Sequence, residues 1–190
     1  MKLKVVDFLG SVERLAWAKD NGCPLEPKTC ARLARNGQLA VLQSARAHGC
    51  PWGPTACTTC SHAATNWHLE VLRWAREHHC PWNSATCHCA VAGGHLGVVQ
   101  WVREHNNCSW DPDTCAEAAG GGHLEVLQWA WEHHCPWNEF TCFHAARSGH
   151  LEVLQWARAH DCPWHASMCA RAADERGHVE VARWVRAQAL

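Results

Sequence analysis

The chain has 190 residues, a formal net charge of -1 with neutral histidines, and a pI near 6.9. This balance argues against the basic surface by which proteins bind nucleic acids or anionic membranes. Hydrophobic residues make up 47%, with thirteen Trp and fourteen Cys against three Phe and no Tyr. So skewed a composition indicates that one short segment, rich in Trp, Cys, His and Ala, has been multiplied along the chain.

The first residues, 1–11, are expected to be a lead-in to an array that spans 12–190. Asp7 interrupts the apolar run near the start, so no secretory signal is predicted. The chain contains no apolar run of roughly eighteen residues, so no transmembrane helix is predicted either. We therefore expect a soluble intracellular protein whose cysteines stay reduced.

Copies of one segment follow each other along the chain. Close copies such as HLEVLRWAREHHCPWN begin at His68, His95, His123 and His150, and degenerate copies begin at Ser11, Gln38 and His178. A cysteine that usually follows Thr recurs 27 or 28 residues apart, at Cys60, Cys87, Cys115, Cys142 and Cys169. So constant a period is typical of a repeat array and not of a domain with a single core.

Each unit is predicted to hold two short helices. The first begins at the Thr-Cys pair, where Thr141 is placed to cap it, and ends at a glycine such as Gly149. The second runs from Leu151 to about His160, with Glu152 in the first turn, where the helix dipole favours an acid. A Cys-Pro-Trp turn then ends the helix, because Pro cannot continue it.

The second helix carries an apolar stripe too wide for a single neighbour. In one copy it comprises Leu124, Val126, Leu127, Trp129 and Ala130. Such a helix must lie between its own partner and the adjoining units. The predicted fold class is therefore all-α, a helical solenoid with a period near 27 residues.

The segment AARSGHLEV, from Ala145 to Val153, resembles the AAxxGHLEVV core of the ankyrin repeat family. The phrases HLEVLQWA and CPW resemble most the short Trp- and Cys-rich ankyrin-type repeats of giant DNA viruses of amoebae, such as pandoraviruses. The resemblance covers about Val12 to Ala187 and implies some six and a half ankyrin-like helix-turn-helix units. The usual period of about 33 residues is shortened here, so no β-hairpin finger is expected.

The resemblance implies a non-enzymatic protein-protein interaction module, which we expect to hold a host protein in the host cytoplasm. Positions that vary while their neighbours repeat are the best candidates for a binding surface. Six of them stand two residues after the repeated cysteine, on the helix that lines the concave face in ankyrin proteins. These predicted partner-binding residues are Arg32, His62, Cys89, Glu117, His144 and Arg171. The alternative is a passive repeat remnant, in which these positions have drifted.

Zinc is the other alternative, with Cys57, Cys60, Cys87 and Cys89 as ligands of a zinc-stabilised module. A structural zinc site needs four converging ligands, usually in two close pairs. Twelve of the fourteen cysteines instead fall at two repeat positions, so repetition explains them better. We predict small core residues and neither a metal nor a cofactor.

Cysteines about seven residues apart, such as Cys135 and Cys142, are a further alternative, since they could bridge in an oxidising compartment. The histidines that open the second helices are predicted to hydrogen-bond to the preceding turn. They are not predicted to be catalytic, because a catalyst needs one special site. The repeated Trp residues are predicted to pack in the core, since no basic groove accompanies them.

Two places depart from the repeat. Trp67 replaces the glycine that ends the first helix, and the stack is predicted to bend or loosen between residues 50 and 70. The last segment, Val179 to Leu190, has an apolar stripe with no later unit to cover it. End-to-end self-association is therefore expected to be open to the chain.

Overall fold

The computed structural model describes residues 11–53, 58–106 and 110–188, and all regular structure in these ranges is α-helical. None of the described helices has the length and apolarity needed to cross a bilayer. The predicted all-α repeat fold is confirmed. In chain order the helices are α1 (Val12–Asp20), α2 (Pro27–Arg35), α3 (Leu39–Ala47), α4 (Thr58–Thr65), α5 (Leu69–Glu77), α6 (Ser84–Gly93), α7 (Leu96–Asn106), α8 (Pro112–Gly120), α9 (Leu124–Glu132), α10 (Glu139–Ser148), α11 (Leu151–Ala159), α12 (Ala166–Glu175) and α13 (Val179–Gln188).

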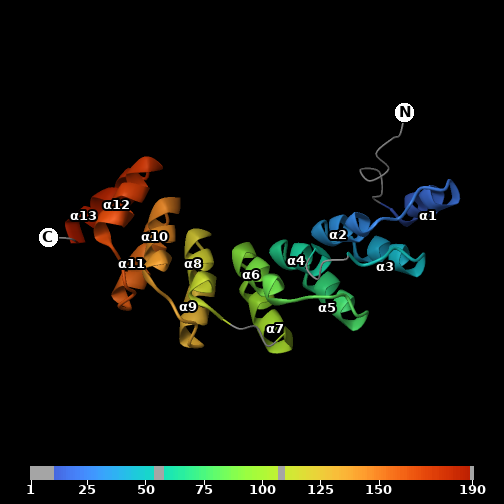
Figure 1. The fold of residues 1–190 in the computed structure, drawn as a ribbon, viewed down its shortest axis with the longest axis horizontal. Helices are drawn as coiled ribbons and strands as arrows, with labels where there is room; N and C mark the ends of the chain where they lie inside the picture. Colours follow the sequence, from blue (N-terminus) through green and yellow to red (C-terminus); the bar gives the residue numbers. More distant parts are fainter. Residues whose placement is uncertain (1–10, 54–57, 107–109, 189–190) are drawn as a thin grey trace. The chain divides into compact units, whose positions relative to one another are not determined.

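The chain forms two compact units, Met1–Cys89 and Ala90–Leu190. In the first unit α2 packs on α4, α1 packs on α3, and α2 and α4 each contact their own second helix, α3 and α5. In the second unit α10 lies between α8 and α12, and these three contact α11, α9 and α13 respectively (Figure 1). Within each unit, helices of one kind therefore stack on helices of the same kind, as a solenoid requires.

The core combines small residues from the first helices with aliphatic residues from the second. Small side chains let first helices approach closely on both flanks, while the second helix supplies the larger aliphatic side chains of the core. In one pair the buried residues are Thr141, Cys142, Ala145 and Ala146 from α10 and Val153, Leu154 and Ala157 from α11. The repeated cysteine is fully buried, as predicted for a small core residue.

Helices α2, α6, α8 and α10 begin two residues before the repeated Thr, so the prediction that Thr141 caps its helix is wrong. The Asn138 side chain accepts a hydrogen bond from the backbone N–H of Phe140, at 3.0 Å, and helix α10 begins at Glu139. In α8, Asp111 Oδ1 accepts from the backbone N–H of Thr114, also at 3.0 Å. An Asn or Asp just after the turn thus accepts a hydrogen bond from a backbone N–H group in the first turn of the helix, and the Thr141 side chain is buried in the core.

The predicted glycine ends of the first helices are confirmed. Gly122 and Gly149 adopt left-handed backbone conformations, with φ of +75° and +85°. Trp67 takes the same conformation, with φ of 69° and 64% of its surface exposed. Residues 54–57 lie outside the described part of the chain, so the loosening of residues 50 to 70 stays a prediction.

The histidines that open the second helices link one repeat to the one before. Their Nε2 atoms donate to carbonyl oxygens at or near the end of the preceding repeat's first helix. The pairs are His68 to Arg35 at 3.0 Å, His123 to Ala92 at 3.0 Å and His150 to Gly120 at 3.1 Å. A structural hydrogen bond was predicted and is confirmed for these three, although the acceptor belongs to the previous repeat.

In two Cys-Pro-Trp turns, those of Trp52 and Trp164, the Trp lies between an arginine of its own repeat and a Trp of the next. The Arg46 guanidinium sits 4.3 Å from the ring centre of Trp52, whose ring is in turn 5.9 Å from that of Trp74. Trp74 also stacks on His78, at 4.2 Å. These rings are half-buried, so the Trp columns join neighbouring repeats at the edge of the core and do not fill its centre.

Candidate functional site

The six predicted binding residues lie at equivalent places on six first helices. Glu117 and Arg171 are exposed, and the other four are half-buried. Their helices are α2 for Arg32, α4 for His62, α6 for Cys89, α8 for Glu117, α10 for His144 and α12 for Arg171. Since first helices stack side by side within a unit, these residues form one row in each unit.

In the first unit, the row brings Arg32 and His62 onto the packed helices α2 and α4. Burial lowers the pKa of the His62 imidazole, and the positive charge of Arg35 lowers it further. His62 is therefore neutral at physiological pH and can both donate and accept a hydrogen bond.

In the second unit, the row runs from Glu117 through His144 to Arg171. Burial lowers the pKa of His144, and Arg147 adds to this effect while Asp113 opposes it. Arg171 pairs with Glu175 one turn later, at 3.7 Å. The row thus presents the carboxylate of Glu117 on α8, the neutral imidazole of His144 on α10 and the positively charged guanidinium of Arg171 on α12.

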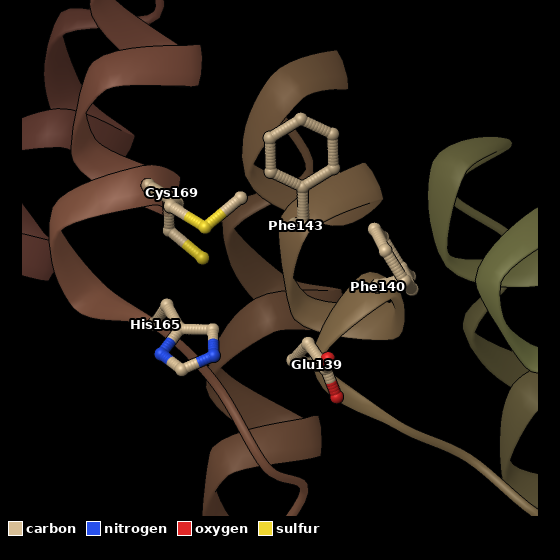
Figure 2. A pocket seen from close by; sticks show the side chains of 6 residues that line it. Glu139, Phe140, Phe143, His165 and Cys169 are labelled. Atoms are coloured by element: carbon tan, nitrogen blue, oxygen red, sulfur yellow. The ribbon is translucent and has the colours of Figure 1, made fainter.

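Beside this row, a cavity of about 150 Å³ opens between α10 and α12. Figure 2 shows Glu139, Phe140 and Phe143 entering from α10, with His165 and Cys169 on the other side. Burial raises the pKa of the Cys169 thiol to about 11, so this thiol is uncharged at neutral pH. The lining is completed by Met168.

The pocket adjoins the predicted row. The ring of Phe143 lies 5.6 Å from the imidazole of His144 and 6.4 Å from the ring of Phe140. Phe140, Phe143, His144 and Arg147 are spaced 3, 1 and 3 residues apart, which places them along one face of α10. An apolar pocket and a polar row therefore form one continuous surface of the second unit.

This pocket exists because the repeat pattern is broken in two adjacent helices. At the position of Phe143 most other repeats carry a buried Ala or Ser, as in Ala31, Ser61, Ala116 and Ala170. Met168 stands where five other repeats carry a buried Thr, and 37% of its surface is exposed. Sequence analysis missed the pocket, although rare residue types at otherwise uniform positions would have been the signal.

The structure does not support the alternative of a zinc site formed by Cys57, Cys60, Cys87 and Cys89. Cys60 interacts with Cys80, and Cys87 is disulfide-bonded. Cys57 lies outside the described residues, within which no group of three or more His, Cys, Asp or Glu side chains could hold a metal ion. The disulfide at Cys87 also contradicts the expectation that all fourteen cysteines are reduced.

Comparison with solved structures identifies the fold. The crystal structure of the human ASB11 ankyrin repeat domain superimposes with a TM-score of 0.60, covering 83% of this chain and 81% of that one at 13% sequence identity. So low an identity shows the shared fold alone. No family model matches the sequence, and no curated protein matches it. The chain thus has the fold of an ankyrin repeat domain.

Proposed function

We propose that this protein is a non-enzymatic scaffold that binds another protein through the first helices of its second unit. The observation that carries the proposal is the apolar pocket between α10 and α12, which lies at positions where the repeat pattern is broken. Repeated residues build the scaffold, so a cluster of departures that creates an accessible cavity is where recognition is expected.

The pocket suits one apolar side chain of a partner. Its lining includes two phenyl rings and a thioether, and 44% of the Phe140 surface and 37% of the Met168 surface are exposed in the chain on its own. Large side chains anchored in such pockets supply most of the binding energy in protein interfaces, while the polar rim contributes specificity. We therefore place the anchor of the partner between α10 and α12.

Charges beside the pocket suggest the orientation of the bound segment. Asp113 and Glu117 make α8 acidic, whereas α10 and α12 carry charges of both signs. A segment with a basic residue on the α8 side would be steered into place.

The viral origin and the cellular location of the protein are proposed only from the resemblance to the repeats of giant viruses. Repeats with HLEVLQWA and CPW phrases resemble those of giant viruses of amoebae, so we propose a viral protein that binds a host protein in the host cytoplasm. Nucleic acid and membrane surfaces are not proposed as partners, because the net charge of -1 provides no basic footprint.

Self-association through the C-terminal end has less support than the sequence suggested. In α13 the apolar residues Val181, Ala182 and Val185 are buried, with at most 2% of each exposed. Val179 remains exposed by 62%, but a single exposed apolar residue does not make an interface.

Selection from a random peptide library on phage, against the immobilised full chain in reducing buffer, tests the proposal. We expect enriched peptides to share a large apolar residue, and Phe143→Ala to weaken their binding roughly tenfold or more. This variant should fold, because Ala116 and Ala170 occupy the same place in neighbouring repeats.

Glu125→Ala is the matched control, since Glu125 is exposed on the second helix α9 and lies off the proposed surface. Its binding should equal that of the unchanged chain. No enrichment would favour a passive remnant, and peptides that bind the Phe143→Ala variant equally well would place the site elsewhere.

A further inference from the structure

Cysteines 20 residues apart form thiol pairs inside successive repeats. The Sγ atoms of Cys30 and Cys50 are 3.2 Å apart, with Cys30 donating to Cys50. One member lies on the first helix of a repeat, and the other lies in the turn that ends its second helix. In three other repeats the corresponding thiols lie close enough for one to shift the pKa of the other: Cys60 lowers the pKa of Cys80, Cys135 raises that of Cys115, and Cys162 raises that of Cys142.

The surroundings of the pairs are also repeated. The turn cysteine donates its own S–H to the backbone carbonyl just before the first helix, from Cys50 to Glu26 at 3.4 Å and from Cys162 to Asn138 at 3.5 Å. All eight thiols are buried, with at most 4% of any residue exposed. A geometry that recurs in four repeats is a property of the fold and not of one site.

We propose that these four pairs are oxidation sites, each of which closes to a disulfide by exchange with a small disulfide such as oxidised glutathione. In the Cys30–Cys50 pair, whose sulfurs are 3.2 Å apart, the two atoms need to approach by only about 1 Å to reach bonding distance. Each bond would tie the start of a first helix to the end of its second helix. Each of these four helix pairs would thereby be held by one covalent cross-link.

Exchange begins at the turn cysteine. Hydrogen bonds from their partner thiols lower the pKa of Cys50, Cys80 and Cys162, and Arg46 or Arg158 lowers it further. The same thiol contacts raise the pKa of Cys30 and Cys142. In these three pairs the turn cysteine is therefore the member that supplies a thiolate. In all four pairs the turn cysteine precedes an exposed proline at the protein surface.

The step balances as two successive exchanges. The turn thiolate attacks the small disulfide, whose S–S bond breaks to give a mixed disulfide and one small thiolate. The helix cysteine then loses its proton to solvent and attacks the turn sulfur, which releases the second small thiolate. Two protein thiols have been oxidised and one small disulfide reduced. The buried sulfurs are reached through local opening of the turn.

Cys87 supports this proposal, because it holds the same repeat position in α6 and is disulfide-bonded. Cys23 and Cys169 provide internal controls. The residue 20 positions before Cys23 is Leu3, and the residue 20 positions after Cys169 is Ala189, so neither has a pairing partner in the register of the others.

The test exposes the folded full chain, without denaturant, to glutathione mixtures ranging from reducing to oxidising. After quenching with acid and alkylation of the remaining thiols, non-reducing peptide mapping should recover the bonds Cys30–Cys50, Cys60–Cys80, Cys115–Cys135 and Cys142–Cys162. Each bond shows as a cross-linked peptide lacking two hydrogen atoms. Cys142→Ala should remove only the last bond, and Cys169→Ala should remove none.

Melting temperature gives a second readout. Oxidation should raise it by several degrees, and dithiothreitol should reverse the gain, because each bond closes a loop of about 20 residues in the unfolded chain. Eight free thiols at the oxidising end would overturn the proposal. Bonds between cysteines seven apart, a pattern as scrambled as that formed in denaturant, or an unchanged melting temperature would overturn it as well.

Discussion

The Nε2 atom of His150 lies 3.1 Å from the carbonyl oxygen of Gly120, so the histidine that opens one repeat satisfies the end of the preceding first helix. The same imidazole fills the space above Gly122. A Cβ atom built on Gly122 would lie 2.7 Å from the ring, closer than real Cβ contacts come. The glycine and the histidine of successive repeats therefore depend on each other.

Gly122→Ala should lower the free energy of unfolding by roughly 2 to 3 kcal/mol, because it adds a clash with His150 to a left-handed backbone. Urea titration followed by Trp fluorescence measures the loss. Gly177→Ala is the matched control, since Gly177 has a φ of +77° but nothing within 4 Å of its Cβ position. Equal losses for both variants would contradict the clash.

His150→Ala should cost roughly 1 to 2 kcal/mol, since the Gly120 carbonyl loses its donor. In the His150→Ala background, Gly122→Ala should cost no more than Gly177→Ala does in the unchanged chain. A double-mutant cycle from four urea titrations gives the coupling between the two positions. Additive losses would show that the histidine and the glycine do not interact.

His134→Gly should stabilise the chain by about 0.5 to 1 kcal/mol. His134 is exposed and has a φ of 61°, a conformation that glycine adopts without strain, as Gly49 does after α3 with a φ of +81°. Thermal melts of both proteins check the gain. Glu132→Gly, at the end of helix α9, serves as the opposite control and should destabilise the chain.

Trp129→Ala should cost about 2 kcal/mol, less than the 3 to 5 kcal/mol typical of a fully buried aromatic residue. The ring is half-buried and contacts Trp110 at 5.3 Å and His133 at 4.2 Å. Trp17→Ala, with 57% of the Trp17 surface exposed, should cost little. Chemical denaturation of both variants tests whether the Trp columns hold repeats together.

Stability should fall as the pH drops through the range of an ordinary histidine, near 6.5. The pKa of His144 is lowered in the folded chain by burial and by Arg147. The unfolded chain therefore takes up a proton at a higher pH than the folded chain does, and acid favours unfolding. His144→Gln should make the dependence of unfolding free energy on pH shallower between about pH 7 and pH 5.

His134→Gln is the matched control for the pH measurement, because its exposed imidazole lies outside the proposed binding surface. The unfolding free energy of this variant should vary with pH as that of the unchanged chain does. An equally steep dependence for His144→Gln would show that His144 does not contribute to acid sensitivity.

The parts of the fold that repeat were predictable from sequence. The period, the glycine ends and the structural role of the histidines follow from residues that recur at fixed positions, such as Gly149 and His150. The prediction for Thr141 was wrong because the capping residue is set by the point at which the turn ends. Asn138 is the first residue after the turn that can cap, and it accepts the hydrogen bond. Local patterns locate a helix more reliably than they locate its first residue.

The thiol pairs and the pocket depended on tertiary structure. Cys142 lies seven residues from Cys135 in sequence, but the helix pair folds back and brings it to Cys162. The pocket needed Phe143 and Met168 on adjacent helices, which is visible only when the repeats are aligned and their departures compared. The binding row remains a prediction, although its residues lie at accessible places.

The histidine links also give the array a direction. Each link is donated by the later repeat and accepted by the earlier one, from His68 back to Arg35 and from His150 back to Gly120. A ribosome synthesises the acceptor first, so each of the repeats that donate these links emerges after the helix on which it docks. Shortening the gene from its 3′ end would leave a carbonyl that water can solvate, whereas shortening it from the 5′ end would leave a histidine without its template.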